Sequence, residues 1–122
     1  MKTVKSLMVV LLIVAVTTTL SAQKKIDPTG TWTFKAEQAP YEYNSGDIVI
    51  GKDGNDYTAK IVFGEYYKID ASGVKYEKNE LSFKVYIEGE SVYVKGTVEK
   101  DEINGTASYS DGTISYNAKK KE

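Results

Sequence analysis

The residue types that most often perform catalysis are scarce in this chain. It contains no histidine and no cysteine, and all 16 of its basic residues are lysines. The missing histidine and cysteine exclude the common nucleophile–base pairs and the metal sites built on imidazole or thiolate groups. The missing arginine removes the bidentate group that reads phosphates, carboxylates and guanine edges.

Carboxylates are the remaining groups that could perform chemistry, since a pair of them can hydrolyse a glycosidic bond. The segment from Lys52 to Tyr57 offers oxygen ligands for calcium, but a full calcium loop needs more ligands and a bidentate acid. No acid is expected at an inward position among apolar neighbours, where a raised pKa would arise. We place the acids in turns or on polar strand faces: Asp53, Asp56, Asp70, Glu88, Glu90, Asp101, Glu102 and Asp111. We therefore predict no catalytic residue, no metal site and no cofactor, and a protein that is not an enzyme.

Aromatic residues are the chain's most prominent remaining feature, with ten tyrosines, three phenylalanines and one tryptophan. An inward tyrosine needs a hydrogen-bond partner or access to water for its hydroxyl. Several inward tyrosines therefore indicate a polar-lined cavity, although the rings could instead fill a narrow barrel completely. The candidate ligand-binding residues are Trp32, Phe34, Tyr41, Tyr43, Tyr57, Phe63, Tyr67, Tyr76, Phe83, Tyr109 and Tyr116.

The elements that position these side chains are short β-strands. From Glu80 to Lys120, apolar and polar residues alternate, and turn residues recur roughly every 8–12 positions. The first half of the chain follows the same pattern, with turns expected at Asp53-Gly54 and Ser72-Gly73. We predict an all-β fold, a single small antiparallel up-and-down barrel of about eight or nine short strands, because curling the sheet buries its apolar face and removes its edges. A β-sandwich is the alternative.

The first 22 residues have the order of a secretory signal peptide. Lys2 and Lys5 precede the apolar run from Leu7 to Val16, and small residues end the segment at Ala22. The apolar run is shorter than the roughly 20 residues that a membrane-spanning helix needs. We therefore expect residues 1–22 to be cleaved, residues 23–122 to form one domain, and the protein to be exported to the periplasm or the extracellular space.

Gly30 and Trp32 at the first strand, followed by the hairpin series up to Ala118, resemble the lipocalin and calycin superfamily, most closely the small bacterial lipocalin-like domains. The resemblance implies a barrel that holds small apolar or amphipathic ligands entering by its open end. It also implies that the tryptophan packs across the closed end under a basic residue from the last strand, which here is Lys119 or Lys120.

Two functional hypotheses follow from these observations. The first is a non-enzymatic binding barrel, with Trp32 and Phe34 at its floor and with Tyr41 and Tyr43 as a lid on the loop Gln38–Gly46. The second is a protein-interaction, inhibitor or glycan-binding module that uses this loop and the outward tyrosines, with an envelope protein as a possible partner. The formal net charge of −1, with both signs interspersed, argues against nucleic acid as a partner. No stretch after the leader is apolar enough for an integral membrane protein.

Overall fold

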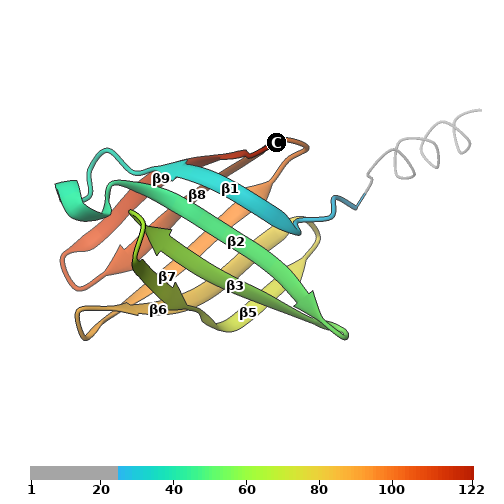
Figure 1. Cartoon of the computed structure of the whole chain (residues 1–122), viewed down its shortest axis with the longest axis horizontal. Helices are drawn as coiled ribbons and strands as arrows, with labels where there is room; N and C mark the ends of the chain where they lie inside the picture. Colours follow the sequence, from blue (N-terminus) through green and yellow to red (C-terminus); the bar gives the residue numbers. More distant parts are fainter. Residues whose placement is uncertain (1–24) are drawn as a thin grey trace, which may run out of the picture.

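The structure is a computed structural model that describes residues 25–122, so the expected signal peptide lies outside the described residues. Within this range the chain forms nine strands in one antiparallel sheet (Figure 1). The strands are β1 (Gly30–Lys35), β2 (Ser45–Asp53), β3 (Asp56–Phe63), β4 (Tyr67–Asp70), β5 (Ser72–Glu77), β6 (Glu80–Ile87), β7 (Glu90–Val98), β8 (Glu102–Tyr109) and β9 (Gly112–Lys120).

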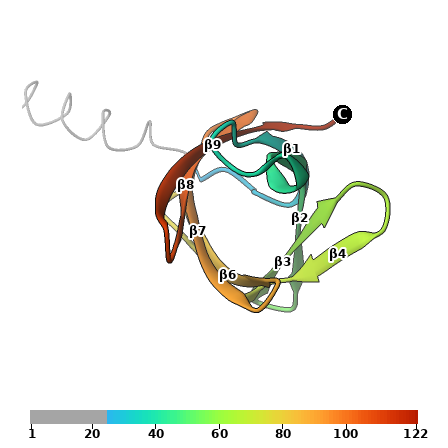
Figure 2. The same cartoon turned by 90° about the vertical axis from the view of Figure 1, so that its left-hand side faces the viewer.

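The sheet curls into a nearly closed barrel, which Figure 2 shows end-on. Its strand order is β4-β3-β2-β1-β9-β8-β7-β6-β5, so the first and last strands pair with each other in the middle of the sheet. Phe34 of β1 lies opposite Ala118 of β9. The predicted all-β barrel is confirmed, because a single sheet wraps around one core and no second sheet is packed against it among the described residues.

The barrel closes through one bent stretch of chain made of β4 and β5. The two strands run in the same direction, β4 pairing with β3 and β5 pairing with β6. Between them, Ala71 donates its N–H to the carbonyl of Ala59 on β3 (2.9 Å). The stretch 67–77 therefore leaves the ladder of β3 and joins that of β6, and it fills the gap between the two edges of the sheet.

The turn predicted at Ser72-Gly73 is wrong, because the chain does not reverse there. Ser72 pairs with Lys84, and Lys75 pairs with Ser82, so β5 holds one extra residue relative to β6. Gly73 adopts a left-handed backbone conformation (φ 61°) within this β-bulge. A glycine accommodates this conformation without steric cost, and the bulge bends the strand rather than ending it.

The core consists of the inward residues of every long strand, as the alternation predicted. Strand geometry sends every second side chain to the same face, so a period of two fills the barrel interior. The most deeply buried large side chains are Trp32, Phe83, Ile48, Leu81, Ile103, Val85 and Val98.

The connection from β1 to β2 contains the only helical element of the described chain, the single 3₁₀ turn η1 (Tyr41–Tyr43). Residues 36–44 form this loop, which differs from the predicted range Gln38–Gly46. Gly46 already belongs to β2 and pairs with Phe34; a Cβ atom there would lie 2.4 Å from the Val62 carbonyl oxygen. Within residues 25–122, no helix has the length and apolar character needed to cross a membrane.

Candidate ligand-binding cavity

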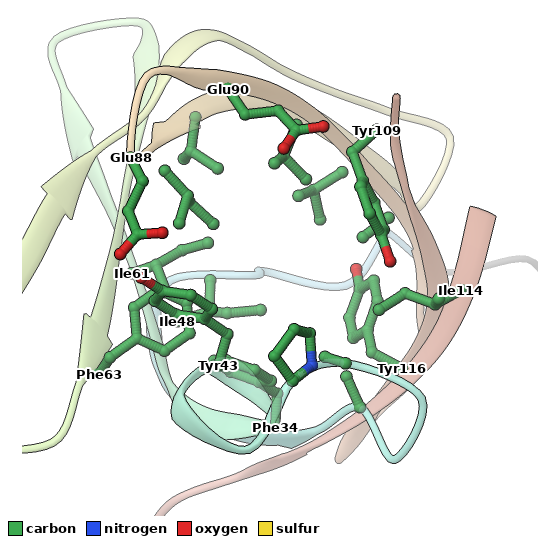
Figure 3. Close-up of a pocket in the computed structure, with 18 of the residues that line it drawn as sticks. Phe34, Tyr43, Ile48, Ile61, Phe63, Glu88, Glu90, Tyr109, Ile114 and Tyr116 are labelled. Atoms are coloured by element: carbon green, nitrogen blue, oxygen red, sulfur yellow. The ribbon is translucent and has the colours of Figure 1, made fainter. Parts of the chain in front are cut away.

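One end of the barrel is closed by the segment that precedes β1. The Tyr76 hydroxyl donates to the Ile26 carbonyl (2.5 Å), and the Ile26 N–H donates to Oδ1 of Asn79 (3.1 Å). Pro28 is fully buried beside them. Figure 3 shows this pale blue segment crossing behind the open interior. These contacts fix the chain across the barrel, so this end is the floor.

Trp32 forms the centre of the floor, with 0% of its surface exposed. Its indole Nε1 donates to the carbonyl of Pro28 (2.9 Å), which satisfies the polar atom of an otherwise apolar side chain. The Lys120 ammonium lies 5.2 Å from the centre of the indole ring, within the range of a cation–π contact. Of the two lysines expected at this position, Lys120 is the one in contact.

The other end of the barrel holds an open cavity of about 310 Å³. Figure 3 shows it lined by aliphatic and aromatic side chains from strands on all sides, with the loop 36–44 along one edge of the opening. Phe63 packs edge-on against Phe34 (5.8 Å between ring centres) and against Tyr43 (5.1 Å). The volume is at the lower end of the range for small-molecule sites, so the cavity has room for one small ligand.

Acidic side chains surround the mouth of this cavity. Of the 19 residues that line it, three are acids and none is a base. Glu88 lies in the two-residue turn between β6 and β7, Glu90 begins β7, and Asp111 lies in the turn between β8 and β9. Both turn residues Glu88 and Gly89 have positive φ, the type I′ geometry that suits a tight hairpin.

Neutral polar groups interact with two of these carboxylates. Both the N–H and the hydroxyl of Ser110 donate to Oε1 of Glu90, and these bonds lower the pKa of Glu90 below its ordinary value of 4.5. The Tyr43 side chain interacts with Glu88 across the mouth, from η1 to the β6–β7 turn. Glu90 is therefore ionised at neutral pH, and Glu88 links the loop 36–44 to the opposite wall.

The contact between Tyr43 and Glu88 predicts a specific titration. The hydrogen bond to Glu88 stabilises the protonated phenol and raises the pKa of Tyr43 from 10.0 to about 12. Because the folded-state pKa is the higher one, the contact stabilises the fold fully below pH 10, and this stabilisation is lost as the pH rises through about 12. Ultraviolet titration of the Glu88→Gln variant should show one tyrosine ionising closer to pH 10 than in the parent protein. Identical titration curves for the two proteins would contradict the contact.

Tyr116 is the one buried polar side chain of the described residues that lacks a hydrogen-bond partner. Only 7% of its surface is exposed, and burial raises the pKa of its hydroxyl. The hydroxyl lies over Gly96, where a Cβ atom would come within 2.5 Å of it, and the ring edge lies over Gly105. Tyr116 and Tyr109 both line the cavity (Figure 3), but the Tyr116 hydroxyl itself is enclosed. The two glycines thus make room for this phenol.

Five of the eleven predicted ligand-binding residues line the cavity: Phe34, Tyr43, Phe63, Tyr109 and Tyr116. Trp32 and Phe83 are buried in the core and do not line the cavity. Phe34 lines the cavity, so the prediction that it shares the floor with Trp32 is corrected. Tyr57 and Tyr76 stack edge-on at the closed end of the barrel (5.4 Å).

Tyr41 and Tyr67 do not line the cavity either. Tyr41 is 90% exposed on the outside of the loop, so Tyr43 is the lid residue that faces the opening. Tyr67, 41% exposed, touches Phe63 and Tyr43 from β4, where the edge strand separates from the barrel wall (Figure 2). Tyr67 was predicted to point inward, and it does not, because β4 leaves the barrel wall at this residue.

The acids at the mouth are the site residues that the sequence reasoning missed, because it placed Glu88, Glu90 and Asp111 in solvated turns. In an up-and-down barrel, alternate turns lie at the same end. The expected reversal at Ser72-Gly73 would have placed the β6–β7 turn at the opposite end from the loop 36–44. In the structure, residues 67–77 continue in one direction, so every later strand runs opposite to the direction predicted. The turns at 88–89 and 110–111 therefore lie at the mouth.

Comparisons with known proteins bear on the fold alone. No protein-family model and no curated protein matches this chain. A solved structure of a redesigned beta barrel is similar, with a TM-score of 0.53 and 16% sequence identity over 77% of this chain and 91% of that chain. The similarity supports the barrel architecture, and at this identity it carries no information about function.

Proposed function

We propose that this protein is a non-enzymatic binding protein that holds one small apolar or amphipathic molecule in the barrel cavity. The observation that carries the proposal is the open, largely apolar cavity of about 310 Å³. Protein interiors are normally packed with few voids larger than a water molecule. A cavity of this size, open at one end and floored by a solid core, is the ordinary architecture of a small-molecule site.

The lipocalin-like resemblance and the predicted export belong to the same proposal. Lys120 over Trp32 at the closed end is the arrangement that the resemblance implies. In the periplasm or outside the cell, such a protein would carry or sequester a poorly soluble molecule. Chemistry on that molecule is not part of the proposal, because the residues around the cavity offer no nucleophile–base pair.

Binding of the neutral fluorescent probe phenylnaphthylamine to the purified chain tests the proposal. Its fluorescence should rise saturably with one probe per protein and should fall when decanol is added as a competitor. Fluorescence that rises without saturation, or that decanol leaves unchanged, would show that the cavity does not take up a small molecule.

A second candidate is an outer binding surface for a protein or a glycan. Tyr86 lies opposite Ser91, and Tyr93 lies opposite Lys84, so the two tyrosines are diagonal neighbours. Both rings are exposed, and diagonal neighbours lie roughly 7–8 Å apart, so together they offer a small aromatic surface. Retention of the chain on a glycan resin, lost on Tyr86→Ala and Tyr93→Ala, would favour this candidate.

A further inference from the structure

The residues that line the cavity carry negative charges and no positive charge, whereas the closed end carries both signs. At the closed end, Lys120 lies over Trp32 and Lys52 lies over Tyr57 (4.9 Å). At the open end, the residues that line the cavity include Glu88, Glu90 and Asp111 but no lysine. Since the whole chain carries 16 lysines against 17 acids, this mouth departs clearly from the average composition of the surface.

The three carboxylates at the mouth are not neutralised by neighbouring cations. Within residues 25–122, the ion pair is that of Lys121 with Asp47, which involves none of them. The groups that approach Glu88 and Glu90 are neutral donors, from Tyr43 and Ser110. Neutral donors orient a carboxylate without cancelling its charge, and an apolar wall concentrates the field in the opening.

Aromatic rings stand next to these carboxylates. Tyr43 contacts Glu88 directly, and Tyr109, on the strand that precedes Asp111, also lines the opening (Figure 3). Carboxylates combined with aromatic faces attract ammonium groups, the first by charge and the second through the ring quadrupole. An anionic or neutral head group would gain nothing from this combination.

The second, independent feature is the buried Tyr116 hydroxyl, which has no hydrogen-bond partner among the described residues and lies enclosed against Gly96, just beneath the cavity lining. Burying a hydroxyl without a partner is unfavourable, so a polar atom that reaches it would be favoured. On β9, Tyr116 lies between Ile114, which is nearer the mouth, and Ala118, which is fully buried. The cavity thus offers a negative mouth, an apolar middle and one hydrogen-bonding group deeper inside.

We propose that the ligand is a cationic amphiphile, with an amine held at the mouth by Glu88, Glu90 and Asp111, an apolar body in the cavity, and a hydrogen-bonding group that reaches Tyr116. This inference rests on the proposed binding function and names its ligand class. It makes the barrel selective among apolar molecules by the charge of their head groups.

The experiment compares three probes that share one chain and differ in head group: decylammonium, decanol and decyl sulfate. Each displaces phenylnaphthylamine below the concentration at which it forms micelles. The ammonium should bind at least about tenfold more tightly than decanol, and the sulfate most weakly, since a factor of ten needs only the modest energy of a few charge contacts. The preference should shrink as salt is added.

Two variants with the same change in net charge separate the mouth from the rest of the surface. Glu88→Gln, Glu90→Gln and Asp111→Asn together should abolish the preference for the ammonium over decanol. The control, Asp53→Asn, Asp56→Asn and Glu77→Gln, neutralises acids at the closed end and should keep the preference. Equal binding of all three probes to the parent protein would overturn the inference, whereas failure of every probe, phenylnaphthylamine included, would overturn the proposed function itself.

The role of Tyr116 has its own test with aminodecanol, whose hydroxyl is at the far end of the chain from its amine. In the parent protein, aminodecanol should gain affinity relative to decylammonium through Tyr116. In Tyr116→Phe this gain should fall by about fivefold, the value of one hydrogen bond. An identical ratio in the two proteins would overturn the role assigned to Tyr116.

Discussion

Replacing Trp32 with alanine is expected to lower the free energy of unfolding by about 3–5 kcal/mol, the usual cost of truncating a buried aromatic residue. The indole is fully buried at the centre of the floor, so its removal leaves a cavity that the rigid strands around it cannot fill. The substitution also removes the hydrogen bond to the Pro28 carbonyl, which ties the segment before β1 to the barrel.

Urea denaturation measures this effect, and two control variants divide it into parts. Trp32→Phe keeps most of the apolar surface and loses the indole N–H, so its destabilisation should be smaller. Lys120→Ala removes the cation above the ring together with its aliphatic stem and should cost about 0.5–1 kcal/mol. A Trp32→Ala variant as stable as the parent protein would show that the floor is not packed as described.

Replacing Ala107 with phenylalanine is expected to abolish the binding of phenylnaphthylamine, with a loss of affinity of at least about 100-fold. Ala107 lines the cavity, so a ring at this position occupies the space that the probe needs. Because the ring enters an open cavity rather than a filled core, the free energy of unfolding should change by less than about 1.5 kcal/mol.

Thr106→Phe is the matched control for this variant. Thr106 is the neighbouring residue of β8, and the alternation along the strand places its side chain on the outer face of the barrel. It adds the same ring to the same strand without entering the cavity, so probe binding should persist. Equal loss of binding in both variants would indicate that strand β8 was distorted, and unchanged binding in Ala107→Phe would place the probe elsewhere.

The sequence predicted the core because strands impose a period of two on buried side chains. Trp32, Leu81, Phe83 and Ile103 are inward and buried as the alternation indicated. Tight hairpin turns were also recognisable, because they need positive φ and therefore favour glycine, as at Gly89. Strand periodicity and turn residues depend on neighbouring positions in the chain, so a single sequence is enough to predict them.

The cavity could be predicted only in part, because it depends on which turns share an end of the barrel. A serine–glycine pair serves equally well as a turn or as a bulge, and only the pairing of Ser72 with Lys84 and of Lys75 with Ser82 decides between them. That pairing determines the orientation of the strands from β6 onward relative to the loop 36–44. The five aromatic residues that line the cavity were therefore among the eleven predicted, whereas the acids of its mouth were not.

Native mass spectrometry of the protein recovered gently from its own source tests the central claim most directly. The claim is that the barrel cavity holds a small molecule. It predicts a small adduct, one per chain, that is lost on denaturation and is absent from the Ala107→Phe variant prepared in the same way. A bare protein mass, or an adduct that the Ala107→Phe variant retains, would contradict it.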